Sequence, residues 1–208
     1  MREPATALTD YLLALIALIF LLRLARMDAR RDSVGALMFF SGFAAAAIFG
    51  GTWHGFFSDD TSPAQRVIWW LTQMFTGIAA SGLAVIGLER FGWRDSRALL
   101  MGSAIFVAAY ASYAWFDSRF LVTVIASGAA TLLCLAGLIF HARRSKRSGA
   151  ELVAAGLVLS LFAAVLQQRG VAIHPLHFDH NATYHLWLFP ALGLIYAGNR
   201  RIAANQNI

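Results

Sequence analysis

Long apolar runs, separated by short polar connections, follow one another along the whole chain. Seven runs can be distinguished, over residues 8–25, 34–57, 67–88, 98–116, 120–140, 151–168 and 182–198. Each has about the length, roughly 20 residues, that an α-helix needs to cross a hydrocarbon core of ~30 Å. The runs are continuous rather than periodic, which is typical of helices in lipid and not of amphipathic helices or half-buried strands. The pattern therefore predicts an all-α membrane protein, a seven-transmembrane helix bundle.

The composition strengthens this prediction. Of 208 residues, 59% are apolar and 13% are charged, and the mean hydropathy is +0.61. An ordinary soluble domain is about 45–50% apolar and about 25% charged, so the composition argues against a water-soluble globule. Seven helices and their connections use the full length, so a single transmembrane domain over residues 1–208 is expected.

The basic residues predict the orientation of the bundle. Of seventeen Lys and Arg, only Arg2, Arg66, Arg119 and Arg169 fall outside the connections after the first, third, fifth and seventh runs. Short cytoplasmic loops of membrane proteins carry an excess of Lys and Arg, so the N-terminus is expected outside and the C-terminus in the cytoplasm. The formal charge of +6 is thereby explained by topology, and no nucleic-acid partner is indicated.

The arginine usage bears on the source membrane. Sixteen arginines stand against one lysine, as is typical of proteins encoded by GC-rich bacterial genomes. We therefore expect an integral protein of a bacterial inner (plasma) membrane, in contact with membrane lipids. The single cysteine, Cys134, lies in the middle of the fifth run and is expected to be an inert packing residue.

The histidines supply the main indication of chemistry. His141 lies at the cytoplasmic end of the fifth run, whereas the other five map to the outer ends of the second and seventh runs or to the loop between the sixth and seventh; they are His54, His174, His177, His180 and His185. A polar group in a membrane is costly unless it finds a partner. Neutral imidazoles are good zinc ligands, and three of them leave a fourth position for water. The clustering predicts a zinc site near the outer surface.

Three of these histidines are the predicted zinc ligands: His54, His180 and His185. Positions five apart on an α-helix are rotated by about 140° from a common face, so His180 is expected in non-helical backbone before the seventh helix, with Asp179 or Asn181 near its N-cap. His174 and His177, which flank Pro175 and Leu176, are expected to be surface or entrance residues.

Acidic residues also gather at the predicted outer side, namely Asp10, Asp59, Asp60, Asp117 and Asp179. A zinc-bound water needs a proton acceptor, and nearby carboxylates orient histidine ligands. Asp10 and Asp60 are the predicted catalytic carboxylates, and Asp59 and Asp179 are expected to be solvated or helix-capping. The alternative for Asp10 is that it caps the first helix at the headgroups, stabilised by the helix dipole.

These features together resemble the CREST superfamily of seven-helix membrane proteins, which includes alkaline ceramidases and the progestin and adipoQ receptors. The resemblance implies a zinc-dependent amide hydrolase acting on lipids, with His54 as the second-helix ligand and His185 as the second histidine of a His-x-x-x-His pattern. The first histidine of that pattern would fall at Asn181, and Gly50 and Gln65 replace the serine four residues before His54 and the aspartate eleven residues after it. These departures indicate a divergent, bacterial-type member.

Three functions remain open at this point. The first is a zinc-dependent membrane hydrolase acting on a lipid-like amide or ester at the outer leaflet. The second is a non-catalytic zinc-binding seven-helix receptor or scaffold, whose zinc would be closed by a fourth protein ligand. The third is a transporter or haem protein, which the sequence favours least: no repeat is visible, and the inner half offers only His141 as an axial ligand.

Overall fold

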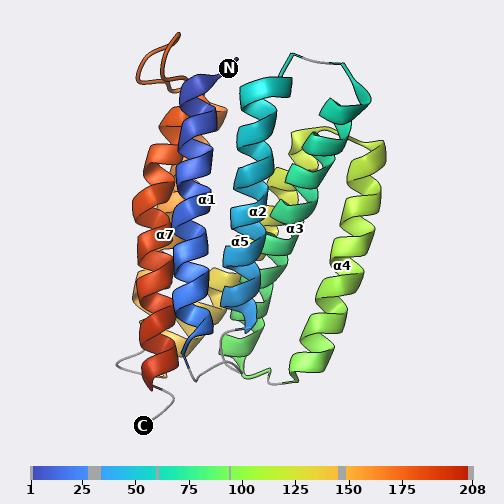
Figure 1. Ribbon diagram of the computed structural model, residues 1–208. Helices are drawn as coiled ribbons and strands as arrows, with labels where there is room; N and C mark the ends of the chain where they lie inside the picture. Colours follow the sequence, from blue (N-terminus) through green and yellow to red (C-terminus); the bar gives the residue numbers. More distant parts are fainter. Residues whose placement is uncertain (1, 28–33, 60, 94, 145–148, 206–208) are drawn as a thin grey trace.

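The computed structural model describes residues 2–27, 34–59, 61–93, 95–144 and 149–205 (Figure 1). Within these ranges the chain forms helices and no strand. The helices are α1 (Pro4–Ala25), α2 (Val34–Thr52), η2 (Trp53–Phe57), α3 (Pro63–Phe91), α4 (Ser96–Phe116), α5 (Phe120–Ala142), α6 (Ala150–Gln168) and α7 (His180–Asn205). Every predicted apolar run is a helix, which confirms the all-α prediction. The π-helical turn η2 continues α2 without a break.

Local sequence signals explain where several helices begin. Ser62 is the N-cap of α3: its side chain accepts a hydrogen bond from the backbone N–H of Gln65 (3.3 Å), and Pro63 occupies the first helical position. Asp95 caps α4 by accepting from the backbone N–H groups of Arg97 and Ala98. Such residues satisfy backbone donors that have no partner inside the helix. The connections before α3 and α4 therefore end at residues that are typical helix N-caps.

The helices pack in a compact order in which α1, α2 and α3 are successive neighbours and α5 also lies against α3. α7 packs against α6 and reaches α1, while α4 lies at the edge of the bundle and packs mainly on α3 (Figure 1). Small residues allow the closest approach, as at Gly42, where an added Cβ would collide with the backbone of Ala79 in α3. Close backbone contact at small residues is a main source of helix association in lipid.

Six of the helices are long and apolar enough to cross a membrane: α1, α2 with η2, α3, α4, α5 and α6. Large apolar side chains face outward, among them Phe116 (85% exposed) and Ile105 (68% exposed) on α4. In water this surface would be unfavourable, whereas lipid accommodates it. The chain is therefore a membrane-embedded helical protein. α7 is not among the six candidate spans, because polar residues such as His180, Asn199 and Arg200 occupy both of its ends.

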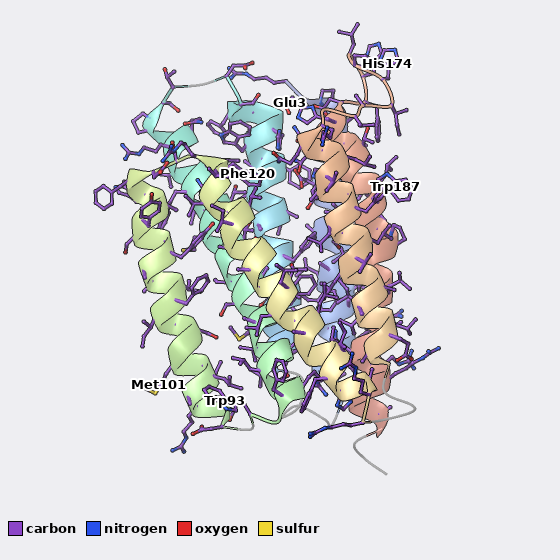
Figure 2. All side chains as sticks on the ribbon, turned by 180° about the vertical axis from the view of Figure 1, so that it is seen from behind. Glu3, Trp93, Met101, Phe120, His174 and Trp187 are labelled. Carbon is purple, nitrogen blue, oxygen red and sulfur yellow. The ribbon has the colours of Figure 1, made fainter. Side chains whose placement is uncertain are left out.

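The two ends of the bundle differ in what they carry. The N-terminus, the α2–α3 and α4–α5 connections and the α6–α7 loop lie at one end, and the C-terminus lies at the other (Figure 1). We call these the N-terminal end and the C-terminal end of the bundle. Glu3 and Phe120 mark the first and Trp93 and Met101 the second, while His174 lies in a loop that projects beyond the helices (Figure 2).

Candidate functional site

A cavity of about 580 Å³ lies within the N-terminal end of the bundle. Its walls come from α1, α2, η2, α3 and α7, with the ends of α5 and α6 adding to the rim. Four of the five predicted site residues line it: Asp10, His54, His180 and His185. We refer to it as the histidine cavity. The fifth predicted residue, Asp60, lies outside the described residues.

The polar residues occupy one part of this cavity and apolar residues the rest. Beside the site residues, Gln167, Gln168 and Asn181 line its rim. Deeper in the bundle the lining becomes apolar, with Leu13, Phe43, Ala46, Ala47, Ala79 and Leu188. Phe43 lies seven residues before Gly50 on α2, which at a rise of 1.5 Å per residue is about 10 Å. The cavity is therefore polar beside the histidines and apolar deeper in the bundle.

Asp10 and His185 form the buried centre of the site. Each is only 7% exposed, and Asp10 Oδ1 lies 3.4 Å from His185 Nε2. Asp10 sits six residues inside α1, which begins at Pro4. The alternative in which Asp10 caps the first helix is therefore wrong, since a cap precedes the first helical residue. A buried carboxylate beside an imidazole inside the bundle is the kind of pair that membrane proteins keep for function.

Thr9 determines which nitrogen of His185 faces Asp10. The Thr9 hydroxyl lies 2.8 Å from His185 Nδ1, and it also lies 2.8 Å from the carbonyl of Ala5 and 2.9 Å from that of Thr6. A hydroxyl has one hydrogen, which these carbonyls of its own helix take, and its lone pairs are then left to accept. We therefore assign Nδ1–H as the donor to Thr9, and the neutral ring presents the lone pair of Nε2 to Asp10.

His54 is held in the same manner from another direction. Its Nδ1–H donates to Glu3 Oε2 over 2.6 Å, because a carboxylate can only accept. The neutral ring thus keeps a lone pair on Nε2. A histidine that donates one ring N–H to a carboxylate or another oxygen, and keeps the other nitrogen for a ligand, is the usual arrangement around a protein metal ion. His54 and His185 both satisfy it.

The backbone around His54 explains how Glu3 reaches it. Residues 53–57 form a π-helical turn, in which each backbone hydrogen bond spans one residue more than in an α-helix. Such turns are frequent at functional sites. The N-terminal residues run alongside this turn: Glu3 N–H donates to the carbonyl of His54 (3.2 Å), and Arg2 N–H donates to that of Gly55 (3.0 Å). At Gly51 an added Cβ would lie 3.0 Å from Asp10 Cβ, so α1 can approach only a glycine here.

His180 is placed differently from the prediction. It is the first residue of α7 rather than part of the non-helical backbone before it, and it is exposed at the rim of the cavity. The reason is the cap: Asp179 accepts from the backbone N–H of Ala182 (2.8 Å), so the helix starts one residue after it. The predicted capping role of Asp179 is confirmed. His180 and His185 consequently point about 140° apart around α7.

Asp179 has a second role that the sequence did not indicate. Its Oδ1 also accepts from the hydroxyl of Thr6 (2.8 Å), so the N-cap of α7 is tied to α1. Together with the Thr9–His185 contact, this hydrogen bond sets the register between α1 and α7. Asp59 is solvated, as predicted, with 81% of its side chain exposed.

The loop histidines lie outside the cavity. His174 and His177 are exposed, and their rings stack with centroids 4.7 Å apart. His174 Nδ1 accepts from the backbone N–H groups of Leu176 and His177, so the neutral ring carries its hydrogen on Nε2 and has no nitrogen free for a metal. The prediction that these two are surface residues is confirmed. His141 lies on α5, at the C-terminal end.

Among the described residues no group of three or more His, Cys, Asp or Glu is close enough together to hold a metal ion. The three-histidine site therefore stays a prediction. What the fold does assemble is a buried Asp10–His185 pair, a second histidine with a free Nε2 on the same cavity, and an outer layer of Thr9 and Glu3 that orients both rings.

Thr9 and Glu3 were missed by reasoning from the sequence. Glu3 precedes the first apolar run, where an acidic residue is expected to face water, and Thr9 looks like an ordinary small residue of a membrane helix. The one signal for Thr9 is its position beside Asp10, whose burial inside a helix requires polar neighbours.

Comparison with known proteins places the chain in a family. Residues 5–204 match the family of unknown function DUF6962. The chain belongs to this family. The DUF6962 match includes Asp10, His54, His180 and His185, so the cavity-lining site residues all lie within it. No curated protein and no solved structure matches the chain.

Proposed function

We propose that this protein is a seven-span membrane hydrolase of a bacterial inner membrane, with the N-terminal end of the bundle outside. In this proposal it binds zinc in the histidine cavity and cleaves an amide or ester of a lipid-like amphiphile at the outer leaflet. The single observation that carries the proposal is the Asp10–His185 pair, in which a carboxylate oxygen and the Nε2 lone pair of a neutral imidazole face each other over 3.4 Å.

The spacing of this pair fits a shared cation. A direct hydrogen bond between N and O spans about 2.7–3.2 Å, and 3.4 Å is longer. Two donors bound to one tetrahedral zinc, with bonds of about 2.0–2.2 Å, lie about 3.4 Å from each other. Two facing lone pairs in a buried site need a positive charge between them or beside them. The donor types of the Asp10–His185 pair therefore fit zinc. His54 would have to move toward this pair to complete the site, because the three residues as placed are not close enough together to hold an ion.

The proposal assigns the donors as His54 Nε2, His185 Nε2 and Asp10 Oδ1. Asp10 replaces His180 in this set because Asp10 is buried beside His185, whereas His180 is exposed at the rim. Zinc bound by three protein ligands supplies a Lewis acid and a water with a pKa of about 7. Asp10 Oδ2, which lies on the side of Gly50, is left to accept a proton from water in the cavity.

The remaining residues of the cavity bind and orient the substrate. The apolar lining from Leu13 and Phe43 to Leu188 accommodates an acyl chain, and burial of each CH₂ contributes about 0.8 kcal/mol. The amides of Gln167, Gln168 and Asn181 at the rim offer hydrogen bonds to the polar part. Gln167 Nε2 already donates to Asn181 Oδ1 (2.8 Å), which fixes the two amides relative to each other and joins α6 to α7.

The test combines metal content with activity. Protein purified in detergent is assayed by elemental analysis and, with N-acyl amides and acyl esters of several chain lengths, by mass spectrometry of released fatty acid. One zinc per chain is expected, with activity lost on chelation and restored by zinc. His54→Ala and His185→Ala are expected to lose both, while His141→Ala at the C-terminal end keeps both.

Each result separates the proposed hydrolase from other functions. Zinc bound without turnover of any amide or ester would favour the receptor or scaffold alternative. Folded wild-type protein without zinc, after supplementation during expression, would refute the metal site itself.

A further inference from the structure

A second cavity, of about 660 Å³, opens at the N-terminal end beside the histidine cavity. We call it the vestibule. It is lined by η2, the α2–α3 connection, the start of α3, the end of α4 and the α4–α5 connection. Its lining includes Trp53, Arg66, Trp69, Trp115 and Phe116. Trp53 and Trp69 line both cavities, and their rings lie 4.8 Å apart. The two chambers are therefore neighbours separated by tryptophan side chains.

Arg66 gives the vestibule a positive charge. Its guanidinium donates to the carbonyl of Trp115 (2.9 Å) and lies 4.8 Å from the centre of the Trp115 ring. Both contacts orient the cation without neutralising it. No carboxylate is among the described residues that line the vestibule.

The two described carboxylates that adjoin the lining of the vestibule in sequence, Asp59 and Asp117, lie next to other arginines. Asp117 lies 2.6 Å from the guanidinium of Arg119, which holds the pKa of that carboxyl well below its usual range. Asp59 lies 4.0 Å from Arg2. Neither is paired with Arg66, so its charge is available to an anionic ligand.

Two further features of the vestibule favour an anionic ligand. The vestibule includes the first turn of the 29-residue helix α3, where the helix dipole favours an anion and no acidic residue is present. The backbone N–H groups of Gln65 and Arg66 are already bonded to Ser62, so the contribution of this turn is electrostatic. Independently, the indole Nε1–H of Trp53 is buried and has no hydrogen-bond partner among the described residues. A buried donor without an acceptor is rare in a native protein and indicates a missing partner. Because the atom has no exposed surface, a ligand oxygen in the vestibule would reach it after a shift of the indole ring.

We propose that the vestibule binds the phosphate of an anionic phospholipid headgroup. Arginine binds phosphate through paired, charge-assisted hydrogen bonds. The lipid source is favoured by Trp53, Trp69 and Trp115, since tryptophans gather at headgroup level in membrane proteins. It is also favoured by Phe116, which is 85% exposed beside the site. The vestibule thereby holds a membrane lipid beside the histidine cavity.

The experiment measures lipid binding to the full chain in detergent. Brominated phosphatidylglycerol quenches nearby tryptophans, and competition with the unbrominated lipid gives its affinity. Phosphatidylglycerol is expected to bind at least fivefold more tightly than zwitterionic phosphatidylcholine, and inorganic phosphate alone is expected to compete only weakly. Equal affinity for the two lipids would overturn the proposal, and competition by inorganic phosphate at equal concentration would replace the lipid with a free anion.

Two variants and one control locate the binding. Arg66→Gln is expected to weaken phosphatidylglycerol binding about tenfold, as for one charge-assisted contact, and Trp53→Phe, which keeps a ring but removes the N–H, several-fold. Arg119→Gln removes a nearby arginine that is paired with Asp117 and should change the affinity less than twofold. The Arg66→Gln protein should elute at the same volume as the wild type and have the same melting temperature. If this folded variant binds phosphatidylglycerol with unchanged affinity, the proposal is wrong.

The inference does not rest on zinc or on hydrolysis. His185→Ala, which is expected to abolish metal binding, should bind phosphatidylglycerol as the wild type does. Loss of zinc with retained lipid binding, or the reverse, distinguishes failure of one proposal from failure of the other.

Discussion

The hydroxyl of Thr9 lies 2.8 Å from Nδ1 of His185, and this contact orients the Nε2 lone pair of the ring toward Asp10. The two residues are 176 positions apart in the sequence and belong to the first and last helices. A threonine in a membrane helix often only bonds back to its own helix. Here the same hydroxyl does that and also accepts from an imidazole on another helix. A residue of α1 thus determines which ring nitrogen of His185, on α7, carries the hydrogen.

Thr9→Val removes the hydroxyl at nearly constant shape. Because the substitution frees His185 Nδ1 from its acceptor, zinc affinity should fall about 10- to 100-fold, as for other outer partners of metal ligands. Thr9→Ser keeps the hydroxyl and should retain affinity within a few-fold. Zinc titration against a chelating indicator measures both. Equal affinity for the valine and serine variants would show that Thr9 only packs.

Asp10→Asn and His180→Ala separate the two possible third ligands. Asp10 is buried beside His185 and His180 is exposed at the rim, so the asparagine variant should lose zinc and the alanine variant should keep it. Elemental analysis of each purified protein gives the stoichiometry. The opposite result would restore the three-histidine site that the sequence predicts.

Glu3→Gln tests the outer partner of His54. The glutamine can still accept from Nδ1–H through its amide oxygen but carries no charge, so the hydrogen bond weakens from charge-assisted to neutral. Zinc affinity should fall about tenfold, and Glu3→Ala should cost more. Arg2→Gln, one residue away, serves as the control, since its side chain lies 4.0 Å from the solvated Asp59 and contacts neither histidine.

Cysteine labelling decides whether α7 crosses the membrane. In a Cys134→Ala background, Leu176→Cys lies before α7 at a position 86% exposed, and Ala204→Cys lies at an exposed position near its end. In whole spheroplasts an impermeant maleimide should label residue 176 and should reach residue 204 only after permeabilisation. Labelling of both in intact spheroplasts would mean that α7 does not span the bilayer.

A buried hydrogen-bonded group away from the site should contribute to stability. Tyr110 and Thr123 hydroxyls lie 2.7 Å apart, and Thr123 donates to Gln73 Oε1 (3.2 Å), which connects α3, α4 and α5. Thr123→Val should lower the free energy of unfolding by about 0.6–1.5 kcal/mol, and Thr123→Ser should lower it less. Thermal unfolding in detergent provides the comparison. Zinc content should be unchanged in both, because this group does not line the histidine cavity.

Hydrophobic length predicted the helices well because lipid leaves the backbone few alternatives. Each of the seven apolar runs lies within a helix, and the differences are confined to ends, as where α3 starts at Pro63 and α7 extends to Asn205. Those ends depend on caps such as Ser62 and Asp179, and a cap is recognised only when its side chain is seen to accept. His180 was misplaced for this reason.

The apolar runs were sufficient to predict a membrane protein made of helices, because hydrophobic length is a local property of the chain. They also predicted that histidines and carboxylates gather toward one end, because successive connections fall on opposite sides of a bundle. Which of those residues contact one another became visible only in the packed bundle. Asp10 joined His185, Glu3 joined His54 and Thr9 entered the site, while His180 stayed at the rim. Such pairings depend on the rotation and register of helices that are distant in sequence, and small-residue contacts such as Gly51 against α1 set these only when the bundle is packed.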